Sequence, residues 1–144
     1  MPPLARSVIA VVAGFLVIGA LALGTDQIIR TTVPGVFGPG NRVDSVPWLL
    51  FFQVYVFVYA VFGCWLAARL APSRPMRHAL ILGALGLVLN IAGSAAMWET
   101  APAWYHIAAI AIVMPAAWVG GRIRERQLAG AGDIFRAGGA TPAR

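Results

Sequence analysis

Charged side chains are scarce in this sequence, at 11% of 144 residues against about 25% in an average soluble domain. Hydrophobic residues make up 60% of the chain, and the mean hydropathy is +0.79. A charged content this low is not enough to cover the surface of a soluble globule. We therefore expect a protein whose main partner is the lipid bilayer. The net charge of +6 alone would suggest a nucleic-acid partner, but the hydropathy contradicts this, and we expect none.

Cysteine is also rare: Cys64 is the single one in the chain. This excludes a disulfide framework within the chain and any multi-cysteine zinc or iron–sulfur site. The sequence also lacks a Walker loop, a His-Glu-x-x-His motif and a Gly-x-Ser-x-Gly motif. We therefore assign no catalytic residues and no metal site, and we expect a non-enzymatic protein.

Long apolar runs are what the sequence does have, and four of them reach the roughly 20 residues that a bilayer core requires. They predict transmembrane helices at about residues 7–29, 46–71, 75–98 and 101–121. Short connections make neighbouring helices antiparallel, so the expected fold is all-α, a four-helix up-down-up-down bundle in one domain, residues 1–122. Pro115 predicts a kink in the fourth helix. Residues 123–144 are basic and then rich in Gly and Ala, which predicts a flexible cytoplasmic tail.

Arginine is unevenly distributed between the two ends of the predicted bundle. With alternating spans, nine arginines fall on the side of the termini, and only Arg30 and Arg42 fall on the other. The positive-inside rule then places both termini in the cytoplasm. The chain uses Arg without Lys and is rich in Ala and Gly, which is typical of a GC-rich bacterial genome, so we expect a multi-pass protein of the bacterial inner membrane. Arg6, the apolar run and Ala20-Leu21-Ala22 also resemble the parts of a cleaved signal peptide, which is the alternative, but the run is long for that role and we expect it to stay as a span.

Polar side chains inside the spans are the candidates for function, because they are costly in lipid and normally face the bundle interior. Each predicted helix carries one at or outward of its middle: Asp26, Gln53, Asn90 and His106. If all four face inward, they outline a polar pocket that opens to the outer side. Four further side chains are candidates to line it: Tyr55, Ser94, Met97 and Tyr105.

His106 has three interpretations: a hydrogen-bonded interfacial histidine beside Trp104 and Tyr105, a proton carrier, or an axial ligand to a heme or chlorin. No cofactor is predicted outright, and heme, chlorin or quinone near His106 stays an alternative. Asp26 is four residues before Arg30 on the same helix face, which predicts an ion pair between them. A proton-coupling role beside His106 is the other interpretation of Asp26.

Small residues recur at steps of three and four along the third predicted helix, where they let helix backbones approach closely. The candidates for helix packing there are Gly83, Gly86, Asn90, Gly93 and Ser94. Similar pairs occur in the first helix (Ala10/Gly14, Ala20/Gly24) and in the fourth (Ala116/Gly120, Ala117/Gly121). Such faces serve either the internal bundle or an oligomer, and the sequence does not separate the two.

Two arginine clusters lie at the predicted cytoplasmic surface, and they are either orientation signals or contacts to lipid headgroups or a partner. The residues concerned are Arg74, Arg77, Arg122, Arg124 and Arg126. The order of the spans, the segment from Arg74 to Gly83 and the segment Pro102-Ala103-Trp104-Tyr105 resemble those of small uncharacterised bacterial integral membrane proteins with four transmembrane helices. This resemblance implies the fold and no activity.

Three function classes fit these observations. The first is a non-enzymatic accessory or scaffolding subunit that packs against other membrane subunits or against copies of itself. The second is a small oligomeric transporter or channel with a titratable outward-facing pocket at His106 and Asp26. The third is a redox component that binds heme, pigment or quinone.

Overall fold

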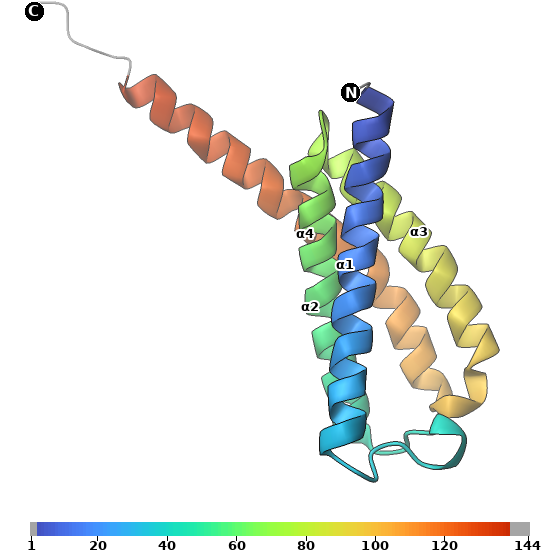
Figure 1. Cartoon of the computed structure of the whole chain (residues 1–144). Coiled ribbons are helices and arrows are strands. Elements are labelled where there is room, and N and C mark those ends of the chain that lie inside the picture. The colour runs from blue at the N-terminus through green and yellow to red at the C-terminus, as the bar shows by residue number, and fades with distance from the viewer. Residues whose placement is uncertain (1–2, 139–144) are drawn as a thin grey trace, which may run out of the picture.

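The computed structural model describes residues 3–138, and within this range the chain forms helices without a strand. The main helices are α1 (Pro3–Thr32), α2 (Val46–Leu70), α3 (Pro75–Ala96) and α4 (Ala103–Gly138). Short 3-10 turns lie in the α1–α2 connection (η1, Pro39–Asn41) and in the α3–α4 connection (η2, Trp98–Thr100). Figure 1 shows the four helices running alternately up and down, which confirms the predicted four-helix bundle.

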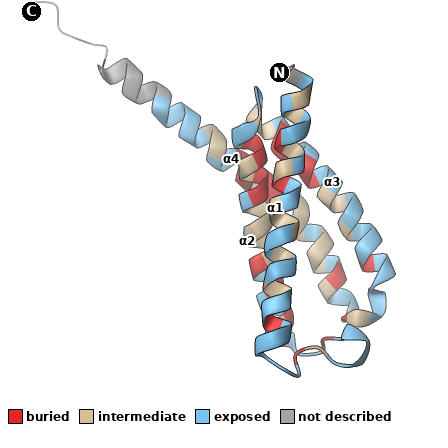
Figure 2. Cartoon of the chain, in the orientation of Figure 1, coloured by how far each residue is buried: buried red, intermediate tan, exposed pale blue. Residues whose placement is uncertain are grey.

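Each of the four helices is long and apolar enough to cross a membrane. The outward faces of the bundle are exposed and apolar, and Figure 2 shows that buried residues lie mainly where the helices meet one another. Lipid tails would satisfy such a surface, whereas water would not, so the chain is a multi-pass membrane protein.

Helix α4 corrects the predicted tail. We expected this helix to end at Gly121 and residues 123–144 to be flexible, but α4 continues to Gly138, and residues 139–144 lie outside the described range. Residues 122–138 contain no proline, and many of them favour helix, so the run of backbone hydrogen bonds is not interrupted. Arg122 and Glu125 add an ion pair of 3.3 Å across one turn. Figure 1 shows this part of α4 projecting away from the bundle.

Glycines bring the helices together in the half of the bundle that holds the N-terminus and the α2–α3 turn. A Cβ atom on Gly14 of α1 would lie 2.6 Å from the carbonyl oxygen of Gly63 in α2. One on Gly120 of α4 would lie 2.6 Å from the carbonyl oxygen of Val61 in α2. Gly83 of α3 is equally close to Ala117 of α4, at 2.4 Å from its Cβ. Three helix pairs therefore meet here at distances that only glycine permits.

The opposite end of the bundle, which we call the loop end, carries the connections 33–45 and 97–102. Here the packing is aromatic rather than small: Phe37, from the first connection, stacks on Phe52 of α2 with ring centroids 5.8 Å apart. The two connections are tied together, because the Val43 amide donates to the carbonyl oxygen of Thr100 at 2.8 Å. A cavity lies between the helices at this end.

Candidate functional site

The cavity at the loop end has a volume of about 320 Å³, which is at the lower end of the range for small-molecule sites. It is lined by all four helices and by both connections at that end. The polar side chains that we singled out in the sequence all line it, one from each helix in chain order: Asp26, Gln53, Asn90 and His106. The four candidate neighbours also line it: Tyr55, Ser94, Met97 and Tyr105.

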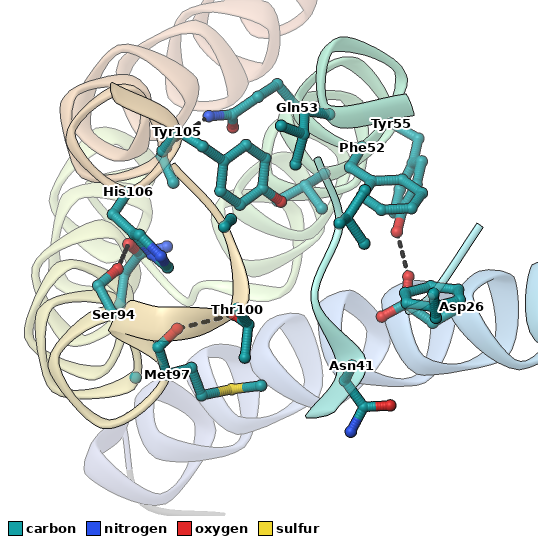
Figure 3. A pocket seen from close by; sticks show the side chains of 18 of the residues that line it. Asp26, Asn41, Phe52, Gln53, Tyr55, Ser94, Met97, Thr100, Tyr105 and His106 are labelled. Atoms are coloured by element: carbon teal, nitrogen blue, oxygen red, sulfur yellow. Dashed lines mark hydrogen bonds between the residues drawn. The ribbon is translucent and has the colours of Figure 1, made fainter. Parts of the chain in front are cut away.

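Asp26 lies on one side of the cavity together with Tyr55 of α2 (Figure 3), whose hydroxyl donates a hydrogen bond to Asp26 Oδ1. The expected ion pair with Arg30 is not formed. Arg30 instead donates from Nη1 to Asn41 Oδ1 at 2.7 Å, and its guanidinium lies 3.9 Å from the centre of the Phe37 ring. The connection after α1 folds back over the helix end and offers Arg30 these partners, which helix spacing alone does not reveal.

His106 lies on the other side of the cavity, near Ser94 (Figure 3). Its imidazole is stacked on the indole of Trp98, with ring centroids 5.1 Å apart and planes 20° apart, and only 5% of the residue is exposed. Nε2 has no hydrogen-bond partner within the described chain. A buried polar atom without a partner is costly, so this nitrogen is available to a bound group or to water. Asp26 and His106 are not bonded to each other.

Between these two sides, α2 and α4 are linked through a polar contact. Gln53 Nε2 donates to the backbone carbonyl oxygen of Tyr105 at 2.9 Å. Figure 3 shows the Tyr105 ring and Phe52 between the His106 side and the Asp26 side. The cavity thus has a hydrogen-bonding side, an acidic side and aromatic rings between them.

The stripe of small residues on α3 serves two purposes, which corrects part of the packing prediction. Gly83 packs tightly on α4, and Gly86 makes only an ordinary contact, its Cβ position lying 3.6 Å from Val113 Cγ1. Asn90, Gly93 and Ser94 line the cavity instead, and no atom lies within 4 Å of a Cβ on Gly93. Near the loop end this face of α3 therefore borders the cavity, which Tyr105 and His106 of α4 also line.

The arginines predicted to meet headgroups or a partner lie at the opposite end from the cavity. Arg74 and Arg77 are exposed at the start of α3, and Arg126 is exposed on the projecting part of α4. Arg122 pairs with Glu125, and Arg124 is half-buried. None of these five arginines lines the cavity, so the two sets of candidate residues are separate in space.

Sequence reasoning missed the part of the site contributed by the connections. Phe37, Asn41, Val43 and Thr100 line the cavity, as does Phe52 on α2. The first four lie outside the apolar runs, so the cost of polar groups in lipid gave no reason to single them out. Phe52 carried no polar signal, although its position beside Gln53 on a helix entering the loop end was visible.

No protein-family model, curated protein or solved structure matches this chain. The geometry of the cavity is therefore what bears on function. Among the described residues, no three His, Cys, Asp or Glu side chains are grouped so that they could hold a metal ion.

Proposed function

We propose that this chain is a membrane-embedded binding protein that takes a small molecule into the loop-end cavity, as the binding unit of a small transporter or channel. One observation carries the proposal: each of the four helices contributes a polar side chain to the same cavity. Burying polar groups in a membrane bundle is costly, and side chains that served only helix packing would have no reason to converge on one space. Concave sites with a few convergent polar groups are typical of ligand binding.

The buried His106 supports the same proposal, because its Nε2 atom lacks a partner on a wall of the cavity. A ligand that hydrogen-bonds to Nε2 would remove the cost of leaving that atom unsatisfied. His78 offers a natural comparison. It is similarly buried, at 9% exposure, but it lies near the start of α3 and does not line the cavity. Its Nδ1 is 3.3 Å from the carbonyl oxygen of Arg74.

The first test asks whether the cavity is reached from the loop end. Ser94 lines the cavity and is close to cysteine in size, while the native Cys64 is 3% exposed and lies in the other half of the bundle. We expect the Ser94→Cys variant in sealed vesicles to react with a small membrane-impermeant thiol reagent added on the loop side. The wild-type protein, with Cys64 alone, supplies the background. Equal, slow labelling of both proteins would overturn an accessible cavity.

The second test identifies the ligand class by screening amines, carboxylates, amino acids, sugars and quinones for protection of Ser94→Cys and for a rise in Tm. A ligand present at 100 times its Kd stabilises the folded state by about 2.7 kcal/mol. We expect His106→Ala to lose this stabilisation and His78→Ala to keep it. Stabilisation that survives in His106→Ala would contradict binding in this cavity.

An accessory subunit is the second candidate, and the projecting part of α4 favours it. Beyond the bundle this helix is exposed from Arg126 to Ala131 and projects away from the other helices (Figure 1). Its one hydrogen bond to another helix among the described residues runs from Trp65 Nε1 of α2 to Gln127 Oε1, at 3.1 Å. Native mass spectrometry of protein extracted gently from its own membranes tests this candidate. A defined hetero-complex would support an accessory subunit, and a homo-oligomer that carries a small molecule would support the binding protein.

A further inference from the structure

Asp26 is the acidic residue on the wall of the cavity, and no cationic side chain among residues 3–138 forms an ion pair with it. The ion pairs of the described chain join Arg42 to Asp44 and Arg122 to Glu125. The one hydrogen bond found for the Asp26 side chain comes from the neutral hydroxyl of Tyr55. A carboxylate within a membrane span normally pairs with an opposite charge. Asp26 therefore offers the cationic group of a ligand a place to bind in the cavity.

Arg30 is the cation nearest to Asp26 along α1 and also lines the cavity, but its charge is engaged elsewhere. Its guanidinium is held between Asn41, through a hydrogen bond of 2.7 Å, and the face of Phe37 at 3.9 Å. Both partners belong to the connection 33–45, so Arg30 is fixed toward the connection. No side chain of the described chain therefore forms an ion pair with the Asp26 carboxyl group.

Aromatic rings surround the acidic side of the cavity. Phe52 and Tyr55 line it with ring centroids 5.8 Å apart, and Tyr59 packs against Tyr55 at 5.4 Å. The faces of such rings attract cations, and the attraction increases where water is excluded. A carboxylate beside aromatic rings favours an organic cation over an anion or a sugar.

We propose, resting on the proposed function, that the ligand is an organic cation with an apolar or aromatic body. Its ammonium group binds at Asp26, its body lies along Phe52 and Tyr105, and a polar group at its far end hydrogen-bonds to His106 Nε2. The cavity of about 320 Å³ accommodates a compact molecule of this kind.

The experiment compares three probes of nearly the same shape and different charge. Phenethylammonium, 2-phenylethanol and 3-phenylpropionate are titrated by calorimetry into the full-length protein in nanodiscs, with empty nanodiscs as the control for partition into lipid. We expect phenethylammonium to bind at least tenfold more tightly than the other two. Asp26→Asn should reduce its affinity to that of the alcohol. Asp44→Asn, in an exposed ion pair outside the cavity, should leave it unchanged.

Equal affinities for the ammonium and the alcohol, tighter binding of the carboxylate, or no binding of any probe would each overturn the cation proposal. None of these outcomes overturns the cavity itself, which is judged by the labelling of Ser94→Cys and by the ligand screen. If Asp26→Asn does not yield folded protein, the comparison of the three probes on the wild-type chain decides.

Discussion

Glycine residues in this protein differ in what surrounds them, and this difference predicts which ones matter. Gly120 faces the backbone of α2, since a Cβ there would lie 2.6 Å from the Val61 carbonyl oxygen and 2.8 Å from the Trp65 nitrogen. Gly24 in α1 has no atom within 4 Å of its Cβ position. Backbone atoms cannot move aside as a flexible side chain can, so only the first site requires glycine.

We predict that Gly120→Ala destabilises the bundle by about 1–3 kcal/mol, because the added methyl group forces α2 and α4 apart. Gly24→Ala should be neutral or stabilising by up to about 1 kcal/mol, because alanine loses less backbone entropy in a helix. Thermal unfolding of both variants in the same detergent measures the difference. Equal Tm values would show that α2 and α4 do not meet at Gly120.

Among the structural elements, the connection 33–45 lies over the cavity and contributes part of its lining. It is held by the bond from Val43 to Thr100 at 2.8 Å, and Arg42 Nη1 donates to the carbonyl oxygen of Glu99 at 3.0 Å. Phe37 adds the aromatic contact to Phe52. Phe37, Asn41 and Val43 of this connection line the cavity, so its position bears on access from the loop end.

We predict that Phe37→Ala speeds the thiol labelling of Ser94→Cys severalfold. The connection would lose both its stacking contact on Phe52 and its cation–π contact with the Arg30 guanidinium. Val33→Ala is the matched control, since Val33 is exposed on the same connection and does not line the cavity. An unchanged labelling rate in Phe37→Ala would show that the connection does not limit access.

The continuation of α4 past Gly121 can be tested by truncation. Deletion of residues 122–144 should decrease the total helical ellipticity per molecule in circular dichroism, because the deleted segment includes helical residues up to Gly138. An irregular tail would leave this total unchanged. Retention of the Tm in the shortened protein would further show that the projecting part adds little to the stability of the bundle.

The orientation of the whole molecule in the membrane stays a prediction from the arginine distribution. We expect Arg42→Cys, on the connection 33–45, to react with an impermeant thiol reagent added outside intact cells. Arg77→Cys, at the start of α3, should react only after permeabilisation. The buried native Cys64 provides the background in both cases. The opposite pattern would reverse the topology and place the cavity on the cytoplasmic side.

The sequence alone determined the number of helices and the antiparallel order, because hydropathy runs and short connections depend on composition along the chain. It also selected four polar residues that the structure places on one cavity, since cost in lipid is a property of each residue type. The length of α4 was predicted wrongly, because Gly and Ala content indicated flexibility where helix-forming neighbours continue the helix.

Rotation of each helix about its axis was decided only by the tertiary structure. The contacts between α2 and its neighbours at Gly14, Gly63 and Gly120 fix these rotations, and the residues in contact lie far apart in the sequence. The contact between α3 and α4 at Ala117 likewise decides that Gly83 packs while Gly93 lines the cavity, although both belong to one stripe. Asp26 meets Tyr55 rather than Arg30 because partners on other elements compete with partners one turn away on the same helix.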